Sequence, residues 1–128
     1  MQACQLTITT AADGNENTIS RKGEFNLSLD NLTVCYREEN ALVSISLRGE
    51  EADMERRGDY DLCLHLQRGA ETEGFIGMGG SEGGISLYTH KVAYSVGKDS
   101  LLLSLHYDLL ISGEKQEMKL RLYAKAVQ

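Results

Sequence analysis

The sequence predicts an all-β protein, a closed antiparallel up-and-down barrel of about eight to ten strands, from three observations. Large apolar residues alternate with polar ones, for example from Tyr60 to Leu66 and from Leu101 to Ile111, and this period places them on one face of a strand. The connections between such segments are short, as in a meander of neighbouring strands. The 128 residues contain no proline, which suits strands whose amide groups are needed in ladders.

Closure of the sheet follows from the need to bury these apolar faces. A single domain over residues 1–128 is long enough to form one core without a disulfide or a metal. A barrel also removes the exposed edges that such long apolar strands would otherwise present. A β-sandwich, in which two sheets cover each other, is the alternative that the sequence leaves open.

Turn residues divide the first half of the chain. Asp13-Gly14-Asn15 ends the first strand, and Asp30-Asn31 is a two-residue hairpin signal. Glu39-Asn40 reverses the chain again, and Arg48-Gly49-Glu50 leads into a short strand. The strands predicted between these turns run over Cys4–Ile8, Thr18–Leu29, Leu32–Tyr36, Val43–Leu47 and Ala52–Arg56.

Glycine-containing turns divide the second half. Gly58-Asp59 and Arg68-Gly69 bound one strand, and the run from Gly79 to Gly84 is the most flexible connection of the chain. Gly97-Lys98-Asp99 and Ser112-Gly113-Glu114 join the last three strands. The predicted strands run over Tyr60–Leu66, Thr72–Met78, Ile85–Val96, Ser100–Ile111 and Gln116–Lys125.

The strand from Ile85 to Val96 changes register. Ile85 and Leu87 share a face with Thr89, whereas Val92 and Val96 have the opposite parity. One extra residue would restore a single buried face and bend the strand. The sequence therefore predicts a β-bulge at Thr89-His90-Lys91.

Composition excludes several function classes. The net charge is -6, the isoelectric point is near 5.0 and the basic residues are scattered, so nucleic acid is not an expected partner. The three cysteines have no Cys-x-x-Cys spacing, which favours reduced thiols in a cytoplasm. The first residues do not resemble a signal peptide, and no apolar run approaches the roughly 20 residues of a membrane span.

Candidate catalytic and metal-binding residues are few, and we expect neither an enzyme nor a cofactor. His65, His90 and His106 show no spacing typical of a metal site, apart from Cys63-x-His65 on an outward face. His106 and Asp108 share an outward face, but this pair lacks a nucleophile. The glycine run is interpreted as a hairpin connection, with a mobile lid over a barrel mouth as its functional alternative.

The strongest candidate polar site combines Glu38 and Arg56. Glu38 continues the inward parity of its strand, and Arg56 continues the parity of Ala52 and Met54. Opposite charges on buried faces should not remain unpaired, because an uncompensated buried charge costs several kcal/mol. We therefore expect an ion pair at one end of the barrel, rimmed by Tyr36 and Tyr60. The alternative is that both strands end earlier and each charge reaches water.

The chain resembles the YwiB-like family of small uncharacterised bacterial proteins. The resembling elements lie along nearly the whole chain and are Gly23-Glu24-Phe25, Tyr36-x-Glu38, Arg56-x-Gly58, Arg68-Gly69, Gly84-x-x-x-x-Thr89-x-x-Val92, Leu103-x-Leu105-x-Tyr107-x-Leu109 and Gly113-Glu114. The sequence departs from the family between Gly77 and Gly84, where a Thr-Pro-aromatic-Gly turn would be expected. The resemblance implies a calycin-like barrel, similar to lipocalins, and no activity.

Two functions from different classes remain as hypotheses. The first is a non-enzymatic barrel that binds a small, partly apolar ligand in its interior or mouth. Its predicted binding residues are Tyr36, Glu38, Arg56, Tyr60, Tyr94 and Tyr107. The second is an interaction or regulatory module that uses its outer face or a homodimer seam, provided that Leu102, Leu110 and Tyr123 gather into one patch.

Overall fold

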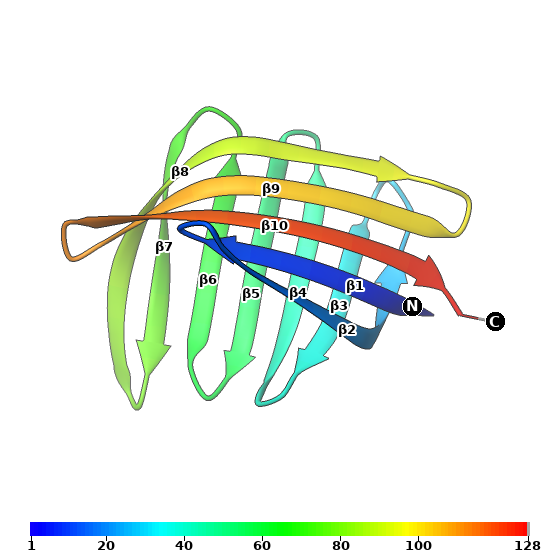
Figure 1. Ribbon diagram of the computed structural model, residues 1–128, viewed down its shortest axis with the longest axis horizontal. Coiled ribbons are helices and arrows are strands. Elements are labelled where there is room, and N and C mark those ends of the chain that lie inside the picture. Colours follow the sequence, from blue (N-terminus) through cyan, green and yellow to red (C-terminus); the bar gives the residue numbers. More distant parts are fainter. Residues whose placement is uncertain (128) are drawn as a thin grey trace.

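The protein, seen in a computed structural model that describes residues 1–127, is a closed barrel of ten antiparallel strands (Figure 1). The strands are β1 (Gln2–Ala12), β2 (Asn15–Asn26), β3 (Leu32–Glu38), β4 (Ala41–Arg48), β5 (Glu51–Gly58), β6 (Asp61–Gln67), β7 (Glu71–Met78), β8 (Ser81–Val96), β9 (Ser100–Ile111) and β10 (Glu114–Ala126). Each strand pairs with its neighbours in the chain, and β1 pairs with β10. The predicted up-and-down barrel is confirmed, and the sandwich alternative is wrong.

The barrel is flattened into two layers whose strands cross. Strands β1, β9 and β10 and the second half of β8 run across strands β3 to β7 (Figure 1). The two layers are joined on one side by β8, which pairs with β7 and then with β9, and on the other by a short seam in which only residues 23–26 of β2 pair with β3. Within the second layer, only residues 61–63 of β6 pair with β7. The inward faces of the two layers therefore pack against each other at a steep angle.

Strand β8 contains the predicted bulge. Thr89 pairs with Tyr107 and Lys91 pairs with His106, so the register shifts across His90. The first half of β8 pairs with β7 and the second half with β9, and the strand bends between them (Figure 1). The extra residue thus turns β8 from one layer into the other and keeps Leu87 and Val92 inside.

Side chains of the two layers fill the interior. The fully buried core includes Leu6, Ile8, Phe25, Leu32, Val34, Ile45, Leu66, Leu87, Leu101, Leu103, Leu105 and Leu122. These residues follow the predicted alternation on nearly every strand. The main hollows formed by residues 1–127 open on the outside of the protein.

Several strand boundaries differ from the prediction. Strand β2 begins at Asn15 rather than Thr18, and Tyr60 lies in the β5–β6 turn rather than on β6. Only Gly79 and Gly80 of the glycine run lie outside a strand, because Gly83 and Gly84 pair with β7. Ladder hydrogen bonds join backbone groups, so a segment without side chains can still form a hairpin.

The cysteines are all free, with Cys4 in the core and Cys35 and Cys63 half-buried. Burial, assisted by the nearby Glu24, raises the pKa of the Cys4 thiol to about 11. No helix within residues 1–127 is long and apolar enough to cross a membrane.

Candidate functional site

Arg56 is a buried basic side chain at one end of the barrel. It follows Ala52 and Met54 on the inward face of β5, opposite Val43 of β4 and Leu62 of β6. Only 8% of its surface is exposed. The strand therefore carries a permanent charge to the edge of the core, where it requires acceptors.

Three residues pair with the Arg56 guanidinium. Its Nη2 lies 2.8 Å from Asp59 Oδ1 and its Nε lies 3.4 Å from Glu38 Oε2. Its Nη1 donates to the Tyr60 carbonyl at 2.7 Å, and its Cζ lies 3.7 Å from the centre of the Tyr60 ring. We call these four residues the Arg56 cluster. The predicted contact with Glu38 is present, and Asp59 is an additional and closer partner.

The Arg56 cluster lies at the rim of the barrel. The Glu38 side chain is 35% exposed and that of Asp59 is 52% exposed. The β3–β4, β5–β6 and β7–β8 turns lie along the same edge of the molecule, the lower one in Figure 1. A hydrogen bond from Arg56 is the main cause that lowers the pKa of Asp59. The cluster is thus a buried cation under a rim of carboxylates.

Two tyrosines form a buried floor near this cluster. Burial, with the nearby Glu38 carboxylate, raises the pKa of Tyr36. Burial, with the nearby Tyr60, raises the pKa of Tyr107 to about 12. Both side chains are only 4% exposed. They belong to the core and leave little of their surface for a ligand.

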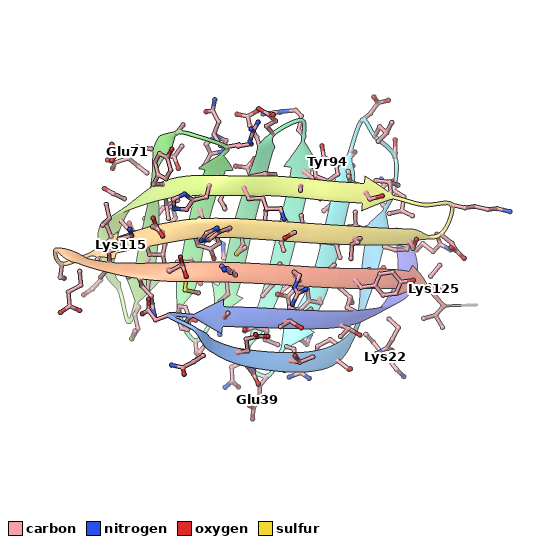
Figure 2. All side chains as sticks on the ribbon, turned by 45° about the horizontal axis from the view of Figure 1, so that its top comes forward. Lys22, Glu39, Glu71, Tyr94, Lys115 and Lys125 are labelled. Atoms are coloured by element: carbon pink, nitrogen blue, oxygen red, sulfur yellow. The ribbon has the colours of Figure 1, made fainter. Side chains whose placement is uncertain are left out.

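Tyr94 lies apart from the other predicted site residues. It is half-buried against the core and pairs with Leu103, several residues beyond the bulge. Figure 2 shows Tyr94 and Glu39, which marks the β3–β4 turn, at opposite edges of the molecule. The structure therefore brings together Tyr36, Glu38, Arg56, Tyr60 and Tyr107, and it does not bring Tyr94 to them.

A hollow of about 180 Å³ adjoins the Arg56 cluster. It lies between the β5–β6 turn and the β7–β8 hairpin. Its lining residues are Gly58, Asp59, Tyr60, Asp61, Gly77, Met78, Gly79, Gly80, Ser81 and Glu82. The lining holds carboxylates and a tyrosine but no lysine or arginine.

A second polar cluster lies on the outer face of β8 and β9. His90 Nε2 lies 2.7 Å from Asp108 Oδ2, and the rings of His90 and His106 have centres 4.6 Å apart. Asp108 is 5% exposed although it faces outward. We call His90, His106 and Asp108 the bulge cluster.

The sequence interpretation missed the bulge cluster as a unit. It placed His106 and Asp108 on one outward face and predicted a bulge at Thr89-His90-Lys91. Each of these statements agrees with the structure. Joining them needs the register of β8 on β9, in which Tyr88 pairs with Asp108 and Lys91 with His106. The signal available in the sequence was a predicted bulge on one strand followed by an outward His-x-Asp on the next strand.

Comparison with known proteins places the chain in a family. Residues 3–122 match the model of a domain of unknown function, DUF1934. The chain therefore belongs to the DUF1934 family. Curated protein sequences give no match.

The fold is similar to that of a solved bacterial protein. The crystal structure of the ywiB protein from Bacillus subtilis matches 99% of this chain with a TM-score of 0.85, at 16% identity and over 93% of its own chain. Together with the DUF1934 match, it confirms the predicted YwiB-like family, and the structural match confirms the predicted barrel fold. At this identity the similarity concerns the fold alone.

Proposed function

We propose that the protein is a non-enzymatic binding protein that holds a small, partly apolar molecule at the mouth of its barrel. The hollow beside the Arg56 cluster carries this proposal. The filled core favours a binding site at the mouth of the barrel rather than one in its interior, because Tyr36 and Tyr107 pack inside with the leucines. A ligand would rest on the turns and leave the core intact.

The chemistry of the hollow favours a positively charged or hydroxyl-bearing head group. Asp59, Asp61 and Glu82 line it without a basic residue. The Tyr60 ring and the 62% exposed Met78 offer apolar and polarisable surface to the rest of the ligand. A primary amine attached to a short apolar chain would match both features.

Arg56 acts in this scheme as a support for the hollow. Its donors already meet Glu38, Asp59 and the Tyr60 carbonyl. It therefore fixes the Asp59 carboxylate and the Tyr60 ring, which do line the hollow. This refines the sequence hypothesis, in which the Glu38–Arg56 pair itself binds the head group.

The setting we propose is a bacterial cytoplasm. Three free thiols and the similarity to a Bacillus subtilis protein support it. A calycin-like use of the barrel, with one small ligand per chain, is an analogy at the level of fold.

Native mass spectrometry of the purified protein, followed by NMR titration, tests the proposal. We expect a co-purifying small molecule, or amide shifts centred on residues 77–82 when short alkylamines are added. Matched alkyl carboxylates should produce no such shifts. The double variant Asp61→Asn/Glu82→Gln should weaken amine binding at least about fivefold, since it removes two charges of the lining.

The control is Glu73→Gln, which removes an exposed carboxylate of β7 outside the hollow. It should leave amine binding unchanged. Absence of a bound molecule together with absence of localised shifts would refute the proposal. Equal losses in Glu73→Gln and the double variant would reduce the binding to a nonspecific charge effect.

The outer face supports a second candidate function, a homodimer or interaction module. Leu102 and Tyr123 are cross-strand neighbours on β9 and β10 and are 53% and 44% exposed. Leu110 does not join them, because it lies eight residues further along β9, about 26 Å at the usual rise per residue. A dimer mass in native spectra that is lost in Leu102→Ser/Tyr123→Ser would favour this function.

A further inference from the structure

The bulge cluster has the composition and convergence of a metal site, and we propose that His90, His106 and Asp108 bind one divalent transition-metal ion, with Zn²⁺ as the best match. One ligand atom from each residue lies within 4.8 Å of the other two. Ligands around Zn²⁺ sit about 2.0–2.2 Å from the ion. Small rotations of the side chains would therefore bring all three atoms to one ion.

Asp108 provides an independent sign that this cluster has unused binding capacity. Its side chain is 7% exposed, and Oδ2 pairs with His90 and with Lys115 Nζ at 3.5 Å. Oδ1 is buried and has no hydrogen-bond partner among residues 1–127. A buried acceptor without a partner costs about 1–3 kcal/mol. A cation held by both oxygens of this carboxylate would satisfy Oδ1.

The backbone explains how the three residues meet. Asp108 and His106 project from the same face of β9, two residues apart. His90 is the extra residue of β8, since Thr89 and Lys91 take the flanking pairs. The bulge thus places two consecutive outward residues, His90 and Lys91, beside His106, where a regular strand would place one. Bulges often re-aim side chains at functional sites.

The surrounding charges act in both directions on a bound cation. Glu117 Oε2 lies 3.2 Å from His106 Nε2 and can orient that ring as a carboxylate behind a metal-bound histidine does. Lys115 competes for Asp108, but its side chain is 65% exposed and can move into water. Lys91 and Lys119 pair with His106 across the sheet. Their positive charges should weaken metal binding.

The donor set selects the kind of ion. Two imidazole nitrogens and one carboxylate suit Zn²⁺, Co²⁺, Ni²⁺ or Cu²⁺, whereas Ca²⁺ and Mg²⁺ prefer oxygen ligands. Three protein ligands leave a coordination position for water or a small anion. Binding requires deprotonated donor atoms, so affinity should decrease in acid as protons compete with the metal.

Titration of the metal-stripped full chain tests the proposal. Calorimetry with ZnCl₂ and visible absorption with CoCl₂ should both give one ion per chain. Asp108→Asn, His90→Gln and His106→Gln should each weaken Zn²⁺ binding at least about tenfold. Lys115→Ala should tighten it, because the competing cation is removed. Circular dichroism and unfolding curves would show that each variant is folded.

His65→Gln is the matched control. His65 lies on the outer surface with Asp53 at 2.7 Å and Glu51 at 3.4 Å, but it is outside the bulge cluster. This variant should bind Zn²⁺ like the parent chain. Absence of stoichiometric binding would overturn the proposal, as would equal effects of His65→Gln and His106→Gln. If Asp108→Asn fails to fold, the two histidine variants at the bulge decide the outcome.

Discussion

The Arg56 cluster and the bulge cluster both bury a charged side chain, but they differ in how completely its polar atoms are paired. Arg56 meets two carboxylates, a carbonyl and an aromatic ring. Asp108 meets a histidine and a lysine with one oxygen only, and its other oxygen is left without a partner. Their degrees of burial are nearly the same.

This difference indicates what each cluster does. A buried charge whose partners are complete fixes local structure, here the turn that carries Asp59 and Tyr60. A buried charge with an orphaned oxygen has unused binding capacity. Stability measurements should therefore respond strongly to changes at Arg56 and weakly to changes at Asp108. Metal affinity should instead respond strongly to changes at Asp108 and weakly to changes at Arg56.

The largest expected effect is that of Arg56→Met. Methionine keeps much of the volume but leaves the Tyr60 carbonyl, Glu38 and Asp59 without their cation. We expect a loss of about 2 kcal/mol in the free energy of unfolding, the size of lost hydrogen bonds to charged groups, because Glu38 and Asp59 are partly solvated and screened once the cation is removed. Urea denaturation at neutral pH would measure this loss.

A double variant separates pairing from packing at the same place. Adding Glu38→Gln to Arg56→Met should recover part of the lost stability, since one uncompensated carboxylate is removed. Each single substitution could instead cost less than about 0.5 kcal/mol in the free energy of unfolding, as for an exposed pair. The Arg56 cluster would then be solvated, and its complete pairing would not contribute to the stability of the fold.

The sequence predicted the faces of both clusters. Alternation placed Arg56 inward and His106 and Asp108 outward, because the period of a strand assigns a face to each residue. The same reasoning placed the bulge within Thr89-His90-Lys91 from a change of parity, and the structure puts it at His90. It also predicted the Glu38–Arg56 pair, because both charges were assigned to a buried face.

Positions along the barrel were harder to predict. Tyr94 has an inward parity but lies far from Arg56, since parity says nothing about distance along the strand. Asp59 and Tyr60 lie in a turn, where alternation gives no information. The contact of His90 with Asp108 depends on the pairing of β8 with β9, which a single sequence does not specify.

Close backbone approach explains two glycines quoted in the family resemblance. A Cβ on Gly58 would lie 2.0 Å from the Asn40 carbonyl oxygen, and one on Gly23 would lie 2.3 Å from that of Cys35. Neither contact is visible in the sequence, because each joins residues more than ten positions apart in the chain. Gly58 lets the end of β5 approach β4 beside the Arg56 cluster.

A smaller effect is expected for Asp108→Asn, and it should depend on pH. Burial opposes ionisation of this carboxyl, but the hydrogen bond and charge of His90 and the charge of Lys115 outweigh it and lower its pKa below the ordinary 3.8. Such a carboxylate stabilises the fold above its unfolded pKa, and the stabilisation is lost as the pH falls through the folded value.

The parent chain should therefore exceed Asp108→Asn in stability by about 1 kcal/mol at pH 6, because both partners are largely exposed and screened. The difference should shrink steadily below pH 4, which urea curves at several pH values would show. A difference that stays constant from pH 6 to the acid limit would mean that Asp108 is uncharged in the fold, and the bulge cluster would lose its anionic ligand.

The smallest expected effect concerns the Tyr60 ring, which covers the Arg56 guanidinium. A cation 3.7 Å from the ring centre is attracted to the electron-rich face. Tyr60→Leu removes that face and should cost about 0.5–1 kcal/mol, whereas Tyr60→Phe keeps the ring and should cost less. The Tyr60 carbonyl that accepts from Arg56 belongs to the backbone and is retained in both variants. Urea unfolding of the two variants should thus separate the contribution of the ring from that of the rest of the cluster.

The control repeats both substitutions in the Arg56→Met background. There the extra loss of stability in Tyr60→Leu relative to Tyr60→Phe should disappear, because the cation is gone. An excess that persists there would assign the ring to core packing, and the completeness of the Arg56 cluster would then rest on its two carboxylates and one carbonyl alone.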